Sequence, residues 1–196
     1  MERKKQLFDT NTIVGLGLLT AIIIVLQTVA KAIPVGVFSI TLVLVPIIVG
    51  AALYGVKAGA WLGFVFGVVV LITDAHAFLQ INIPGTVVTC IAKGMLAGVA
   101  AAAVYKLLSP KSNLVAVIMA GLVSPIVNTA VFLLGCILFF LDTIAGWGLE
   151  AGFGNVYTYL ITAFVGVNFL IEAAINLVLS TTIVTIIKIA TKKIQN

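Results

Sequence analysis

The sequence predicts an all-α membrane protein: a bundle of six transmembrane helices with the N- and C-termini in the cytoplasm. Of its 196 residues, 62% are hydrophobic and only 9% are charged, and the mean hydropathy is +1.30. A soluble domain carries about 45–50% apolar and about 25% charged residues. At about 20 residues per span, six helices use roughly 120 residues. We therefore expect residues 1–196 to form a single transmembrane domain, because too few residues remain for a separate soluble one.

Six apolar runs, separated by proline, glycine and polar residues, each predict one helix. The predicted helices span residues 11–32, 41–54, 58–73, 84–107, 114–141 and 156–189. Pro34 and Gly36 end the first helix, and Pro84 suits the first turn of the fourth. The second helix contains Pro46 and is short for a full span. Residues 142–155, rich in glycine, are expected to form a loop.

The basic residues predict the orientation of the bundle. Of the 11 basic residues, all but Lys31 and Lys93 lie at the N-terminus, at the C-terminus or in the connections expected on the inner side. The outer connections instead carry Asp74, Asp142 and Glu150. This asymmetry follows the positive-inside rule, and it explains the net charge of +5 without any nucleic-acid partner.

The sequence lacks the motifs of several catalytic classes. It contains no Gly-x-x-x-x-Gly-Lys-Ser/Thr phosphate-binding loop and no His-Glu-x-x-His zinc motif. With His76 as its one histidine, it cannot build a multi-histidine metal site. Cys90 and Cys136 both lie in apolar runs, where they are expected to pack as small hydrophobic side chains. We therefore expect no enzyme activity, no metal and no cofactor.

Polar side chains inside the predicted spans are the strongest functional signal, because charges in a bilayer are costly and usually functional. At about 1.5 Å per residue, Lys93, Asn128 and Asn168 lie roughly 14–20 Å from the outer helix ends. Glu172 follows Asn168 by one turn on the same helix face. Together these residues predict a polar ligand site that is open to the outside. A structural Lys93–Glu172 pair, with amides bridging the helices, is the alternative interpretation.

The outer connections supply further candidates for ligand binding. Glycines and aromatic residues alternate in and after residues 142–155, which predicts a mobile cover for a small ligand. The candidate residues from both connections are Asp74, His76, Asn82, Trp147, Asn155 and Tyr157. The aromatic residues alternatively form an interfacial belt, and a lone loop histidine is alternatively only solvated.

Small residues recur at four-residue spacing in three predicted helices. They are Gly17 and Ala21; Gly59, Gly63 and Gly67; and Gly94 and Gly98. Such stripes allow two helices to approach closely. The partner helix lies either within the bundle or in another protein.

With its basic N-terminus, its Gly17/Ala21 motif and six predicted helices, the chain resembles the S components of energy-coupling factor (ECF) vitamin transporters. Segments 44–50, 59–67, 93–98 and 125–129 look like the pantothenate-type branch. The resemblance implies capture of a water-soluble vitamin, pantothenate first of all, at the outer face of the bacterial cytoplasmic membrane. Folate, hydroxymethylpyrimidine and riboflavin are the alternative ligands.

The resemblance also implies partners. S components deliver their vitamin through a T component that is driven by two ATPase subunits. The family's Ala-xxx-Ala motif in the first helix faces the T component, and Gly17 replaces the first alanine here. Two rival hypotheses remain from other classes: a stand-alone secondary carrier that uses Lys93 and Glu172 as an ion relay, and a scaffold without a ligand. Lys93 itself favours an anionic ligand, because an opposite charge offsets the cost of its desolvation.

Overall fold

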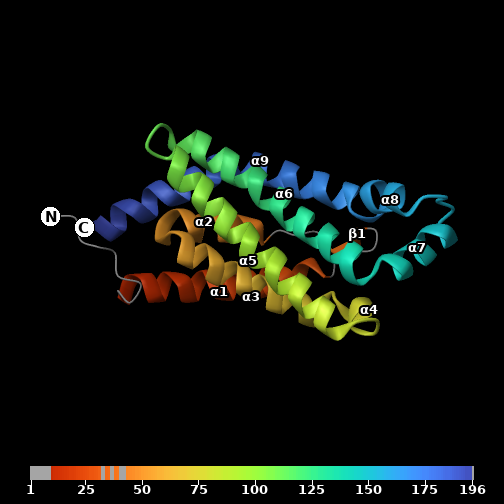
Figure 1. The fold of residues 1–196 in the computed structure, drawn as a ribbon. Coiled ribbons are helices and arrows are strands. Elements are labelled where there is room, and N and C mark those ends of the chain that lie inside the picture. Colours follow the sequence, from red (N-terminus) through yellow and green to blue (C-terminus); the bar gives the residue numbers. More distant parts are fainter. Residues whose placement is uncertain (1–9, 32–33, 36–37, 40–42, 196) are drawn as a thin grey trace.

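The computed structural model describes residues 10–31, 34–35, 38–39 and 43–195, and they form a bundle of long helices (Figure 1). The helices are α1 (Thr10–Ala30), α2 (Leu44–Tyr54), α3 (Val56–Thr73), α4 (His76–Leu79), α5 (Ile83–Leu108), α6 (Asn113–Phe139), α7 (Leu141–Glu150), α8 (Val156–Tyr159), the π-helical η1 (Leu160–Phe164) and α9 (Gly166–Gln195). Strands β1 (Pro34–Val35) and β2 (Phe38–Ser39) pair antiparallel, with Pro34 opposite Ser39. The prediction of an all-α membrane protein is confirmed apart from this short pair of strands.

Five helices are long and apolar enough to cross a membrane: α1, α3, α5, α6 and the Phe169–Lys192 part of α9. Helix α2 has 11 residues, roughly 16 Å at 1.5 Å per residue. It is nevertheless apolar and mostly buried, and it packs against α3, α5 and α9. The count of six spans and the cytoplasmic termini remain predictions.

Residues 142–155, which we expected to form a loop, are largely helical. Helix α7 covers Leu141–Glu150, and Gly152 follows it with a φ of 84°. Glycine costs about 1 kcal/mol in a helix, which is why the glycines of this segment pointed to a loop. The helix forms because its apolar face is buried: Ile144 is fully buried, and Gly148 lies directly against the ring of Tyr159.

The last predicted helix, 156–189, is also interrupted. Helix α8 ends at Tyr159, the π-helical turn η1 follows, and α9 starts at Gly166. A Cβ atom on Gly166 would collide with the carbonyl oxygen of Ile161, so the break needs a glycine there. Breaks of this π-helical kind are frequent at functional sites, and this one lies just before Asn168.

The glycine stripes of α3 and α5 face each other. A Cβ atom on Gly59, Gly63 or Gly67 would collide with the backbone of Gly98, Gly94 or Cys90, respectively. The two backbones are therefore in direct contact, and each glycine is required. For these two stripes, packing within the bundle is confirmed.

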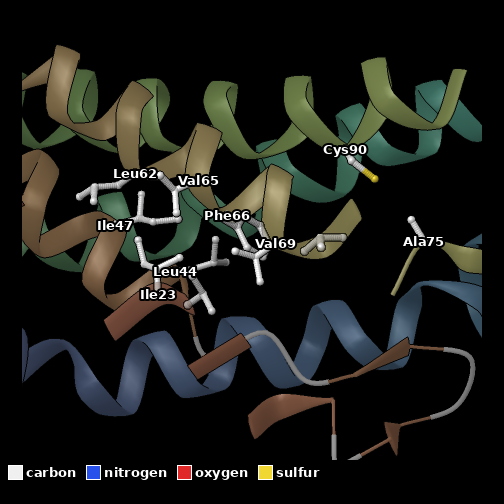
Figure 2. Close-up of a cluster of buried hydrophobic side chains, with 11 residues drawn as sticks. Ile23, Leu44, Ile47, Leu62, Val65, Phe66, Val69, Ala75 and Cys90 are labelled. Carbon is white, nitrogen blue, oxygen red and sulfur yellow. The ribbon is translucent and has the colours of Figure 1, made fainter. Parts of the chain in front are cut away.

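The core consists of three apolar clusters. Figure 2 shows the first, where Ile23, Leu44 and Phe66 join α1, α2 and α3. The second joins α2, α5, α6 and α9, and includes Ala101, Val117, Ala120 and Ile183. The third lies around α4, α7 and α8, and includes Phe78, Cys136, Phe140, Ile144 and Tyr159. The two free cysteines, Cys90 and Cys136, are buried in these clusters.

The two ends of the bundle differ in charge. At one end lie the α5–α6 turn and the C-terminal part of α9 (Figure 1), which carry Lys106, Lys111, Lys188 and Lys192. Helices α4, α7 and α8 lie at the other end, where α7 carries Asp142 and Glu150.

Candidate functional site

Lys93 lies on α5 with its ammonium group between two aromatic rings inside the bundle. Its Nζ atom is 5.6 Å from the ring centre of Phe66 on α3 and 5.1 Å from that of Phe132 on α6. A cation above an aromatic face gains about 0.5–2 kcal/mol, more when it is desolvated. The Lys93 side chain, half-buried, is thus directed toward α3 and α6 rather than toward lipid.

Asn128 lies on α6, one helical turn from Phe132, and is 6% exposed. Its Oδ1 atom has no hydrogen-bond partner among the described residues. An unsatisfied buried amide oxygen costs about 1–3 kcal/mol. Phe132 contacts Lys93, so Asn128 lies one turn along α6 from a residue that touches the ammonium group. That the two side chains share one ligand site remains a prediction.

Thr89 is a further candidate site residue, which the sequence analysis did not name. It precedes Lys93 by one turn on the same face of α5, is 4% exposed, and its Oγ1 atom has no partner in the described part of the chain. Gly135 of α6 packs directly against it. A threonine in an apolar run gives no signal in the sequence, because its hydroxyl can bond to its own helix.

Glu172 lies on α9 and is 2% exposed. Asn168 precedes it by one turn, and its side chain lies outside the described residues. A direct Lys93–Glu172 pair therefore remains a prediction.

An aromatic layer connects Lys93 to the end of the bundle that carries α4 and α7. The ring of Phe132 is 5.9 Å from that of Phe78, which in turn lies 4.9 Å from Phe140 and 5.8 Å from Trp147. Edge-to-face contacts of this kind stabilise aromatic clusters. Trp147, a predicted site residue, is thus linked to Lys93 through Phe78 and Phe132. Phe78 was not predicted, because an aromatic residue in a short polar connection resembles an interfacial anchor.

Three of the predicted loop residues form structural hydrogen bonds. Asp74 accepts a hydrogen bond of 2.9 Å from Nε2 of buried Gln27 and another from the hydroxyl of Thr73. Asn82 caps α5 by accepting 2.9 Å from the Gly85 amide, as expected for an N-cap residue. Asn155 caps α8 in the same way, accepting 2.8 Å from the amide of Tyr157.

The other two predicted loop residues, His76 and Tyr157, are exposed. In the described part of the chain, no recorded contact joins either side chain to the Lys93 region.

Gly17 and Ala21 lie on an exposed face of α1. No atom lies within 4 Å of a Cβ placed on Gly17, and Ala21 is exposed. Large apolar residues, among them Val14, Leu18 and Val25, are exposed on the same helix. The stripe therefore faces away from the described bundle, in contrast to the stripes on α3 and α5.

Among the described residues, no group of three His, Cys, Asp or Glu side chains is placed to hold a metal ion.

Comparison with known proteins identifies the family of this chain. A family model for the ECF transporter, substrate-specific component, matches residues 11–184. No curated protein and no solved structure gives a significant match. The chain belongs to the substrate-specific components of ECF transporters, which are substrate-binding membrane subunits and not enzymes.

Proposed function

We propose that this protein captures a small water-soluble vitamin, pantothenate first of all, from outside the cell membrane and delivers it through a T component and two ATPase subunits. The observation that carries the proposal is the position of Lys93. Its ammonium group lies inside the bundle between two aromatic rings, in the same region as a buried amide oxygen without a described partner.

The chemistry of this region favours an anionic ligand. Aromatic faces replace only part of the water that a half-buried ammonium group loses, and a carboxylate offsets the remaining desolvation cost. Pantothenate carries one carboxylate. Its hydrogen-bonding middle suits the amide of Asn128, the hydroxyl of Thr89 and, on sequence grounds, Asn168. Folates carry carboxylates too and remain an alternative.

The aromatic layer supplies a cover for the ligand. Phe78 and Trp147 come from α4 and α7, short helices at one end of the bundle, so a small movement of these helices would open the region around Lys93. The lysine-rich opposite end suits the cytoplasmic side. We therefore place α4 and α7 outside and both termini inside.

The proposal predicts binding without accumulation when the protein is alone. Mass spectrometry of ligand released from the purified protein should identify pantothenate. In liposomes, the protein alone should bind this vitamin but concentrate it only together with a T component and ATPases, because we expect it to lack an energy source of its own. Gradient-driven uptake by the isolated protein would instead establish the secondary carrier. Release of a different vitamin would show that pantothenate is not the ligand.

The exposed α1 stripe predicts where the T component docks. Gly17→Leu combined with Ala21→Leu should abolish uptake by the assembled complex, because close helix contact depends on small residues. Vitamin binding by the isolated protein should stay near normal, because Gly17 contacts nothing in the bundle. The matched control is Ala103→Leu with Ala130→Leu, two exposed alanines on α5 and α6. Equal uptake by the two double variants would show that the α1 stripe is not the docking surface.

A further inference from the structure

A row of buried polar side chains lies between α6 and α9, deep in the membrane-spanning part. We call Ser124, Asn128, Glu172 and Asn176 the α6–α9 polar seam. They are 0%, 6%, 2% and 2% exposed, respectively. Ser124 and Asn128 are one turn apart on α6, and Glu172 and Asn176 are one turn apart on α9. Each helix therefore contributes a polar edge of about 6 Å.

The register of the two helices brings these edges together. A Cβ placed on Gly121 of α6 would lie 3.6 Å from the Cβ of Asn176 on α9. Because the two helices run in opposite directions, residues further along α6 face residues earlier on α9. One turn further toward the C-terminal end of α6, Ser124 lies at the level of Glu172. Asn128 lies about one more turn along α6. The four side chains thus form one continuous patch.

Apolar residues close the seam at both ends. On one side lies the cluster that includes Val117, Ala120 and Ile183. On the other side lies the cluster with Cys136, Leu160 and Val165. The seam is therefore separated from both ends of the bundle by apolar side chains.

Three polar atoms of the seam have no hydrogen-bond partner in the described residues: Ser124 Oγ, Asn128 Oδ1 and Asn176 Nδ2. The Ser124 hydroxyl can donate and accept a hydrogen bond, Asn128 Oδ1 can accept one, and Asn176 Nδ2 can donate one. Buried groups of this kind are almost always satisfied, either by protein or by ordered water. Gly121 has no side chain beside Asn176. A Cβ placed on Gly121 would lie 3.6 Å from the Cβ of Asn176, so there is space there for a group the size of a methyl.

We propose that the α6–α9 polar seam binds a short row of internal waters, with Ser124, Asn128 and Asn176 as their ligands. Water both donates and accepts, and a buried water typically makes about three hydrogen bonds to otherwise unsatisfied groups. A cation would leave the Asn176 amino group unsatisfied, since that group is a donor. An apolar ligand would leave all three atoms unsatisfied.

The waters have a role that rests on the proposed function. In sequence along the seam, they connect Asn128, which we place against the vitamin, to Ser124 and then to Asn176, which the vitamin does not contact. A water bound to Oδ1 holds the amide of Asn128 in one orientation, so that its hydrogen-bonding groups face the ligand consistently. Ser124 and Asn176 are thus positioning residues for vitamin binding.

The water is tested first, in the full-length protein without ligand. With asparagine and alanine labelled with ¹⁵N in lipid nanodiscs, the side-chain amide of Asn176 should show a nuclear Overhauser cross-peak to water. The exposed amide of Asn113 is the positive control, and the backbone amide of Ala120, in the neighbouring apolar cluster, is the negative one. A cross-peak at Asn113 but none at Asn176 would overturn the proposal.

The positioning role is tested by two serine variants. Ser124→Ala removes a ligand of the water and should weaken vitamin binding about three- to tenfold. Ser180→Ala is the matched control on α9: this hydroxyl donates 2.7 Å to the carbonyl of Leu177 in its own helix, so vitamin affinity should be unchanged. Equal affinities for the two variants and the parent would overturn the positioning role. If the parent binds no vitamin, the proposed function fails, whereas the cross-peak still decides the water site.

Discussion

Lys93→Ala is expected to weaken vitamin binding by about ten- to a hundredfold, measured by isothermal titration calorimetry on the purified protein. A charge-assisted hydrogen bond of the kind that Lys93 would make to a carboxylate contributes about 1.5–3 kcal/mol, which corresponds to this factor. Asn128→Ala and Thr89→Ala should cost less, because each removes a neutral hydrogen bond.

The control for Lys93 must separate ligand binding from stability. Removing one charge from a buried environment can itself unfold a protein, and Glu172 is buried in the same bundle. The double variant Lys93→Met with Glu172→Gln removes both charges at similar volume. If it folds and binds the vitamin as tightly as the parent, Lys93 has a structural role. The ligand would then have to lie among the outer residues near Trp147, His76 and Tyr157.

Gly63→Ala is expected to destabilise the protein strongly, seen as a lower Tm in detergent or nanodiscs. The added Cβ would collide with the carbonyl oxygen of Gly94 and with the Cα of Met95. These are backbone atoms of a packed helix, so relief requires α3 and α5 to separate along their shared face. Overpacking of this kind costs typically 1–3 kcal/mol or more, which exceeds the gain of about 1 kcal/mol in helix propensity.

Gly17→Ala is the matched control, because it makes the same substitution within a long apolar helix. No atom lies within 4 Å of the added Cβ, so only the propensity gain remains. Its Tm should equal or exceed that of the parent. Similar Tm values for the two variants would show that the close approach of α3 and α5 is not needed for stability.

The membrane class could be predicted from composition because a bilayer imposes one simple requirement. Each span needs about 20 apolar residues with its backbone hydrogen bonds satisfied internally. The same physics made Lys93, Asn128 and Glu172 visible, since polar groups are rare and costly in such runs. The start of α5 was equally predictable, because Pro84 suits the first turn of a helix.

Thr89, Ser124 and Asn176 could not be named from the sequence as candidates for the proposed sites. Threonine and serine are common in apolar helices, where their hydroxyls bond to the preceding turn, as Ser180 and Thr185 do. Whether such a hydroxyl lacks a partner depends on which helix faces it. That depends on the register of α6 against α9, which no local pattern encodes.

The sequence alone determines that this is a helical membrane protein with a few polar groups inside its spans and with stripes of small residues. Only the tertiary structure shows which surfaces those residues contact. Gly63 and Gly17 lie in similar stripes, yet Gly63 packs directly against the backbone of α5 whereas Gly17 faces outward. Residues 141–150 form a helix although their glycines favour a loop, because burial of Ile144 and Trp147 in the aromatic cluster outweighs local propensity. Spacing and propensity act within one helix, but packing depends on the surface that a neighbouring helix presents.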